Sequence, residues 1–167
     1  LRIAIPNKGR LSGKAIGILN RIGMNIPEDP GRTLMVNIGK GRYSVLFARA
    51  DDIPEFVDTG AADIGVTGLD ILMEDALKNV VKLLDLGFGR CRLVVAVPED
   101  SGISSPEDIP AGSRVATSFP RLTGSYFQKL GKSIEVISVS GATELTPQIG
   151  VADLITDLTE TGSTLKM

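Results

Sequence analysis

Apolar residues come in short runs along this chain, and the runs alternate with segments whose apolar positions recur at helical spacing. Arg2–Pro6 is the first run and predicts a buried strand. A polar loop follows at 7–10, and the next apolar residues predict an amphipathic helix that ends at Gly23. These residues are Leu11, Ala15, Ile18, Leu19 and Ile22. The chain therefore opens with a strand, a loop and a helix.

The alternation continues through the first half of the chain. Two strands at 34–38 and 43–48 are predicted to form a hairpin around a turn with two glycines. A helix that reaches Asp58 follows, and Gly60 ends it. Further strands are predicted at 63–67 and 80–84, with another helix that opens at Asp70 between them.

The second half has the same pattern, after a glycine-containing stretch at 86–92 that we interpret as a crossing between lobes. Strands are predicted at 92–97, 114–117, 134–139 and 154–158, and helices at 105–108, 120–130 and 144–149. Because strands and helices alternate, the sheets should be mostly parallel with flanking helices. We expect one α/β lobe over 1–88 and a second over 89–167.

A short internal repeat links the two lobes. The sequence G-A-A-D at 60–63 aligns without gaps with G-V-A-D at 150–153, and each copy precedes a strand and the start of a helix. Two short matches can arise by chance. If the repeat is real, the lobes are related, and the motif itself is structural: the glycine ends a helix, the alanine packs, and Asp63 or Asp153 binds backbone N–H groups.

Composition and charge exclude several classes of function. Apolar residues make up 43% of the chain and charged residues 23%, which is ordinary for a globular domain. The net charge of −2 and the 4% aromatic content offer no footprint for nucleic acid. A single cysteine and no histidine exclude the usual zinc sites. No apolar run predicts a membrane span, and the sequence opens on a strand without a secretory signal. This fits a cytoplasmic enzyme, although a mature secreted protein would look the same.

The end of the chain carries the strongest chemical signal. The predicted strand at 154–158 leads into Thr161, Gly162, Ser163 and Thr164, and 165–167 would begin a helix. Backbone N–H groups, hydroxyls and a helix N-terminus together suit a phosphate. The carboxylates of Asp157 and Glu160 suit sugar hydroxyls or a magnesium ion on a polyphosphate. The alternative is an ordinary, well-capped helix start.

Basic side chains are also predicted at the carboxyl ends of two other strands. Lys8 and Arg10 follow the first strand, where open α/β sheets bind ligands. They could equally be solvated loop charges. Arg49 leaves the strand at 43–48, and Asp70, whose simplest role is a helix cap, opens the helix after 63–67.

Three stretches of the chain resemble one family. "ELTPQIGVADLITDLTETGSTLKM", "AIPNKGRL" and "FARADDIP…GAADIGVTGLD" are similar to the signatures of the ATP phosphoribosyltransferases of histidine biosynthesis. The resemblance implies a periplasmic-binding-protein-like (type II) fold with a cleft between two lobes. It implies transfer of a phosphoribosyl group from phosphoribosyl pyrophosphate to N1 of ATP with Mg2+, in a homo-oligomer of dimers or hexamers. A long form adds a regulatory domain; that domain, and a return of the chain to the first lobe, we expect outside this sequence.

The resemblance also implies roles for individual residues. For phosphoribosyl pyrophosphate they are Asp157, Thr159, Glu160, Thr161, Gly162, Ser163 and Thr164, and for ATP and polyphosphate Lys8, Arg10, Arg49, Asp70 and Arg92. Single-domain phosphoribosyltransferases carry two adjacent acidic residues before this loop, whereas this chain has Thr156-Asp157 there. We therefore favour Asp157 over Glu160 as the catalytic carboxylate. The alternative function is a two-lobed module that binds an anion or solute without turnover.

Overall fold

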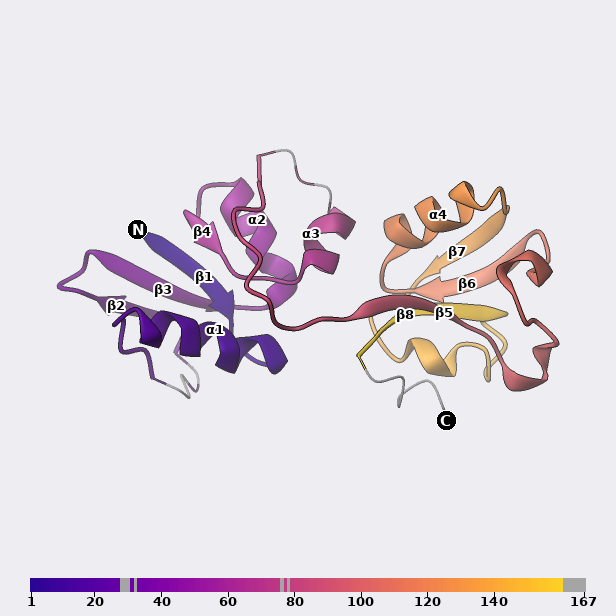
Figure 1. The fold of residues 1–167 in the computed structure, drawn as a ribbon, viewed down its shortest axis with the longest axis horizontal. Coiled ribbons are helices and arrows are strands. Elements are labelled where there is room, and N and C mark those ends of the chain that lie inside the picture. The colour runs from indigo at the N-terminus through magenta and orange to yellow at the C-terminus, as the bar shows by residue number, and fades with distance from the viewer. Residues whose placement is uncertain (28–30, 32, 76, 78, 161–167) are drawn as a thin grey trace. The chain divides into compact units, whose positions relative to one another are not determined.

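The computed structural model describes residues 1–27, 31, 33–75, 77 and 79–160. They form two compact units, Leu1–Gly89 and a second that begins at Arg90, and each is described by itself. Each unit holds one four-stranded sheet with helices around it (Figure 1). The sheets are mixed: two of the three strand pairings in each are parallel and one is antiparallel. The expected two-lobed α/β architecture with mostly parallel sheets is confirmed.

The first sheet has the order β2-β3-β1-β4. Its strands are β1 (Arg2–Pro6), β2 (Met35–Ile38), β3 (Tyr43–Ala48) and β4 (Ile64–Gly65), and its helices are α1 (Arg10–Arg21), α2 (Ile53–Asp58) and α3 (Leu69–Asp75). Alternate residues of β1 serve opposite faces, as the period of a strand requires. Ile3 and Ile5 pack with Ile16 of α1, whereas Ala4 packs with Ile53 of α2. The predicted hairpin of β2 and β3 is present and antiparallel.

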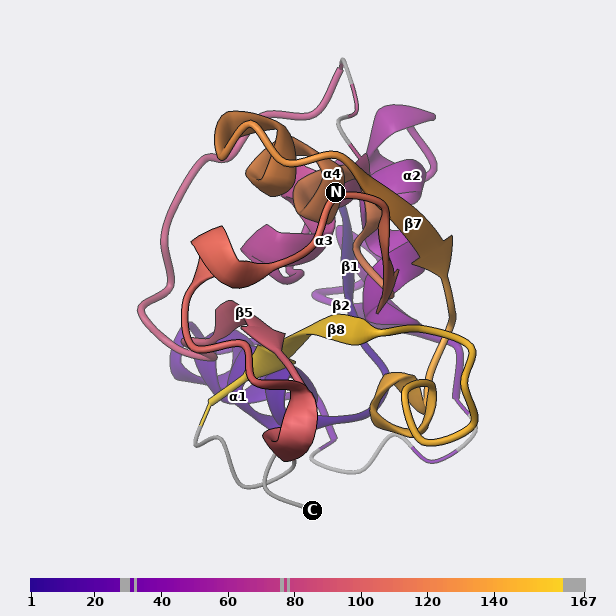
Figure 2. The same ribbon diagram turned by 90° about the vertical axis from the view of Figure 1, so that its right-hand side faces the viewer.

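The second sheet has the order β5-β8-β6-β7, and Figure 2 labels its strands β5, β8 and β7. Its strands are β5 (Arg92–Ala96), β6 (Ser113–Thr117), β7 (Ile134–Ser138) and β8 (Leu154–Thr159), and its one α-helix among the described residues is α4 (Pro120–Lys129). Phe127 of α4 is fully buried against Val115 and Leu154, while Ala116 and Ile155 face the opposite side. Each sheet is thus buried on two faces, which suits its apolar strands.

Two predicted elements are wrong. Residues 80–84 form no strand, although they are apolar, and Val81, Leu83 and Leu84 are exposed. The helix expected at 144–149 is only a 3-10 turn, Thr143–Leu145. Pro147 explains the second error, because it has no N–H to donate into a longer helix. The first error has a different cause, since no partner strand is present for this segment in the described part of the chain.

Candidate functional site

The carboxyl ends of three parallel strands meet at one edge of the first sheet, because β1 pairs in parallel with both β3 and β4. Two hydrogen bonds join the loops that leave these strands. The backbone N–H of Asn7 donates to the carbonyl of Ala48 at 2.7 Å. The hydroxyl of Thr67 donates to the carbonyl of Ala50 at 2.8 Å. The loops after β1, β3 and β4 therefore form one connected surface at this edge.

The predicted cations of the first unit all belong to this edge. Lys8 lies in the loop after β1, and Arg10 is the first residue of α1; both are exposed. Arg49 directly follows β3, and its side chain is 68% exposed, with a guanidinium nitrogen 3.5 Å from a carboxylate oxygen of Asp51. An exposed pair of this length is weak, so the Arg49 guanidinium stays available to a polyphosphate.

Asp70 brings a carboxylate to the same edge, in the first turn of α3. A Cβ on Gly68 would collide with this carboxylate, so the glycine lets the side chain of Asp70 fold back over the chain. The same region is acidic, since the pKa of Asp75 at the end of α3 is raised by burial and by the nearby carboxylates of Glu74 and Asp51. Cations and carboxylates therefore share this surface.

The second unit gathers its predicted residues at the end of β8. Thr159 is the last residue of β8 and lies directly opposite Arg92, the first residue of the antiparallel β5. Asp157 is partly buried, and its Oδ1 accepts a 2.7 Å hydrogen bond from the N–H of Leu158. Glu160 is exposed and follows the strand directly. The structure thus brings Asp157, Thr159, Glu160 and Arg92 to one strand end.

A buried group of threonine hydroxyls lies beside this strand end, and the sequence analysis missed it. Thr117 of β6 pairs with Thr156 of β8. The hydroxyl of Thr117 accepts from the N–H of Phe119 at 2.9 Å and from the hydroxyl of Thr123 at 3.1 Å. The hydroxyl of Thr156 is buried without a partner among the described residues. The signal was available: "ATSFP" at 116–120 follows an apolar strand with small hydroxylated residues, as 161–164 do.

Other predicted residues lie outside the described part of the chain: Thr161, Gly162, Ser163 and Thr164. Glu160 is the last described residue before them. Within the described ranges, no three histidine, cysteine or acidic side chains come together as a metal site. The carboxylates of Asp157 and Glu160 fit a magnesium ion that arrives with a substrate's phosphates, since Mg2+ takes one or two carboxylates in such sites.

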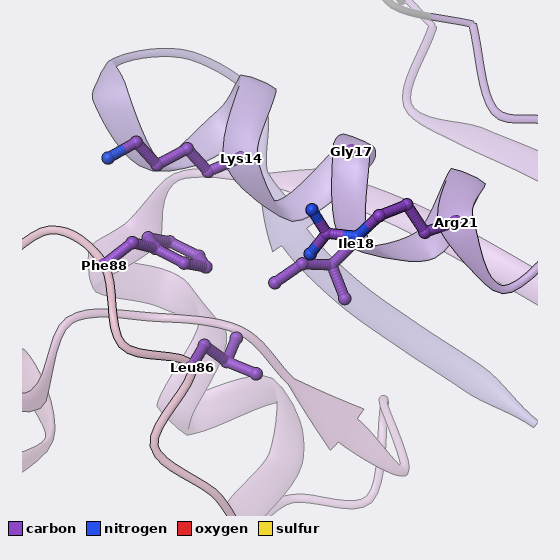
Figure 3. A pocket seen from close by; sticks show the side chains of 6 residues that line it. All are labelled: Lys14, Gly17, Ile18, Arg21, Leu86 and Phe88. Carbon is purple, nitrogen blue, oxygen red and sulfur yellow. The ribbon is translucent and has the colours of Figure 1, made fainter.

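A pocket of about 330 Å³ lies elsewhere in the first unit, between α1 and residues 86–88 (Figure 3). Leu86 and Phe88 face Ile18 and two cations of α1, Lys14 and Arg21, and the Nζ of Lys14 lies 5.6 Å from the centre of the Phe88 ring. None of the predicted site residues lines this pocket. Its cation–π contact instead fixes the end of the first unit against α1.

Residues 49–167 match the family model "HisG: ATP phosphoribosyltransferase". The chain belongs to the ATP phosphoribosyltransferase family. An ATP phosphoribosyltransferase of Methanocaldococcus jannaschii is 52% identical over 168 residues, which cover all of this chain and 58% of the relative. One of Natronomonas pharaonis is 51% identical over all of this chain and 59% of its own length. The chain thus spans somewhat more than half the length of these curated ATP phosphoribosyltransferases.

Solved structures agree with this family. The ATP phosphoribosyl transferase (HisG:HisZ) complex from Thermotoga maritima is 32% identical, with a TM-score of 0.81 over 99% of this chain and 77% of that one. The periplasmic aliphatic sulphonate binding protein SsuA from Escherichia coli, at 16% identity and a TM-score of 0.50, shows the fold alone. The expected likeness to periplasmic binding proteins is confirmed. No helix within the described ranges has the length and apolar character to cross a bilayer.

Proposed function

We propose that residues 1–167 carry the catalytic core of an ATP phosphoribosyltransferase. In this reaction N1 of ATP forms a bond to C1 of the ribose of phosphoribosyl pyrophosphate. The bond from C1 to the pyrophosphate oxygen breaks, and pyrophosphate leaves with the electron pair. N1 attacks through a lone pair and carries no proton, so the site needs no strong base. Catalysis then rests on alignment of the two substrates and on stabilisation of the leaving group.

The end of β8 is the observation that carries this proposal. Asp157, Thr159 and Glu160 stand at a strand end directly before the sequence T-G-S-T, with Arg92 opposite Thr159. In our assignment Thr161, Gly162, Ser163 and Thr164 hold the 5′-phosphate, and Thr159 adjoins it. Asp157 binds the ribose hydroxyls, and the Leu158 N–H orients its carboxylate. Glu160 lies nearer the solvent and serves the metal or the ribose.

The edge of the first sheet supplies the groups for the second substrate. Lys8, Arg10 and Arg49 are exposed cations on connected loops, which suits the polyphosphate of ATP. In our assignment Asp70, which Gly68 allows to fold back, accepts hydrogen bonds from the nucleoside. Arg92 neutralises developing charge on pyrophosphate. Magnesium, carried on the polyphosphate, adds further positive charge there when it is bound.

Pyrophosphate release from ATP and phosphoribosyl pyrophosphate tests this function, with Mg2+ and with a chelator. The unsubstituted 167-residue chain is compared with Asp157→Asn and with a Thr161→Ala, Gly162→Ala double variant. We expect release that depends on magnesium and falls on the order of 100-fold in each variant. Asp100→Asn is the matched control, because Asp100 is an exposed carboxylate in the 3-10 turn Glu99–Ser101 of the same unit.

The same assay separates the two functions considered for this fold. If neither this chain nor one completed to the length of its relatives releases pyrophosphate, the transferase proposal is wrong. If phosphoribosyl pyrophosphate still binds and the loop variant abolishes binding, the chain is a non-catalytic anion-binding module. Assembly as a homo-oligomer stays a prediction, which light scattering of the completed chain would check.

A further inference from the structure

The last residues of the first unit lie along one face of α1. Gly89 is so close to this helix that a Cβ added there would come within 2.6 Å of a side-chain carbon of Leu11. About one turn further along α1, the Nζ of Lys14 lies 5.6 Å from the centre of the Phe88 ring. Leu86 faces the helix beyond that contact (Figure 3). The segment at 86–89 therefore runs antiparallel to α1 and against it.

This contact leaves a pocket of about 330 Å³, and Gly17 forms its floor. A Cβ added at Gly17 would meet no other atom within 4 Å, so the helix backbone is open to the pocket there. Ile18 and Leu86 provide apolar walls, and Phe88 closes the end near Lys14. Cavities of this size with apolar walls and a few convergent polar groups are typical of sites for small molecules.

The pocket is positively charged. Of its six lining residues, Lys14 and Arg21 are cations and none is acidic. Neither cation has an ion-pair partner within the described ranges. Asp85, the carboxylate next to this wall in the sequence, is engaged elsewhere: it accepts the N–H of Gly87 at 2.9 Å and lies 3.7 Å from the Nζ of Lys82. The charge of the pocket therefore favours an anion.

The two cations have different roles in the pocket. Arg21 follows Lys14 by seven residues, which separates their positions by about 10 Å along the helix axis. The Arg21 side chain runs back along α1 toward Ile18 (Figure 3), as helical side chains lean toward the N-terminus. Its guanidinium thus borders the open floor, whereas the Lys14 ammonium lies near the Phe88 ring. A guanidinium also matches carboxylate and phosphate groups with two parallel hydrogen bonds.

We propose that this pocket is a second ligand site of the protein, which binds a small anion that carries a flat apolar ring. The ring lies over Gly17 between Ile18 and Leu86, and the anionic group binds the Arg21 guanidinium. Lys14 adds a second positive charge. Because this occupant contacts both α1 and residues 86–88, it also holds the last residues of the first unit in place. The site shares no residue with those that we assign to the substrates.

An NMR titration of the 167-residue chain with naphthalenesulfonate tests the proposal. We expect the amide signals of Gly17 and of residues 86–88 to shift, with a Kd of about 1 mM or below. Methanesulfonate lacks the ring and naphthalenemethanol lacks the charge, so each should bind at least about 10-fold more weakly. Shifts that occur only elsewhere in the chain would overturn the proposal. Equal binding of methanesulfonate would overturn the assigned ligand class.

Two substitutions and their matched controls locate the site. Gly17→Leu fills the floor and keeps both charges, and Gly13→Leu is its control, since Gly13 lies one turn earlier in α1, has the same open space and does not line this pocket. Arg21→Gln removes the guanidinium, and Arg42→Gln is its control, at an exposed arginine of the same unit. We expect Gly17→Leu and Arg21→Gln each to weaken binding at least about 10-fold, and the controls to leave it unchanged.

The amide signals of the first sheet show whether each variant keeps its fold. If Gly17→Leu and Arg21→Gln are folded and bind naphthalenesulfonate as the unsubstituted chain does, the proposal is wrong. It is also wrong if Gly13→Leu and Arg42→Gln weaken binding as much as they do, because the ligand would then bind no particular site.

Discussion

Asp63 and Asp153 occupy equivalent positions in the two units and make the same pair of backbone contacts. Each accepts a hydrogen bond from an arginine N–H at 2.7 Å, on Arg2 and Arg114 respectively. Each also donates its own N–H to the carbonyl of that arginine at 2.9 Å. Both are preceded by a buried alanine and by a glycine with positive φ, of 75° and 73°. The predicted roles of the alanine and the aspartate are confirmed in both copies. The glycine follows a helix only in the first copy, because the 3-10 turn before Gly150 already ends at Leu145.

The two units differ in whether the arginine side chain also contacts the aspartate. Arg114 turns back on Asp153, with Nη2 2.7 Å from Oδ1, and its Nη1 donates to the carbonyl of Gly150 at 2.8 Å. Arg2 contacts Asp63 through its backbone alone in the described part of the chain. The constant part of the motif is therefore a hydrogen bond to an N–H at the start of a strand, and the ion pair is an addition in the second unit.

The largest effect we expect comes from removal of either carboxylate. Asp63→Ala and Asp153→Ala each leave an arginine N–H at a strand start without its acceptor. Loss of a hydrogen bond to a charged group should lower the free energy of unfolding by about 1–2 kcal/mol. This is less than for a buried hydrogen bond of the same kind, because both sites are exposed. Urea denaturation checks this. Asp100→Ala is the control, and an equal change in all three variants would contradict a role for the motif.

Much of the fold follows from local patterns in the sequence. The helix at 10–21 and the hairpin of β2 and β3 were predicted within a residue or two, because periodicity and turn glycines act locally. The strand at 80–84 was wrong because a strand needs a partner, and no local pattern supplies one. The repeat of G-x-A-D was the one long-range signal in the sequence that pointed to a shared sheet topology.

The candidate site was predictable in its residue types and only partly in its geometry. Carboxyl ends of parallel strands meet at one edge, so Lys8, Arg10 and Arg49 could be grouped from the order of strands. The position of Arg92 opposite Thr159 was not predictable, because it depends on the antiparallel pairing of β5 with β8. Likewise, burial of the Thr156 hydroxyl depends on neighbours that are distant in sequence.

A fall in pH should lower the stability of the second unit and raise that of the first. The Arg114 guanidinium and N–H lower the pKa of Asp153, and backbone N–H groups of Ser104 and Ser105 lower that of Asp108. The stability that these carboxylates contribute to the second unit is complete above the unfolded value of 3.8 and is lost as the pH falls through their lower folded values. In the first unit, burial and neighbouring carboxylates raise the pKa of Asp75, so protonation as the pH falls relieves a cost there.

Hydrogen exchange of each unit between pH 6 and pH 3, corrected for intrinsic rates, checks this difference. We expect opening of the second unit to become easier than opening of the first as the pH falls below about 4. Asp153→Asn should remove part of the pH dependence of opening in the second unit. Asp75→Asn should remove the opposite pH dependence of opening in the first unit. The same pH dependence in both units would contradict this explanation.

The smallest effect we expect distinguishes the two arginines. Arg114→Ala removes the ion pair with Asp153 and the bond to Gly150, but keeps the backbone N–H that the carboxylate binds. Because the Arg114 and Asp153 side chains are 39% and 46% exposed, the free energy of unfolding should fall by less than it does for Asp153→Ala. Arg2→Ala is the matched variant and should change it by less. In high salt the two variants should converge, since screening weakens an exposed pair. A loss for Arg114→Ala as large as that for Asp153→Ala would mean that the guanidinium, and not the backbone contact, holds β8 in place.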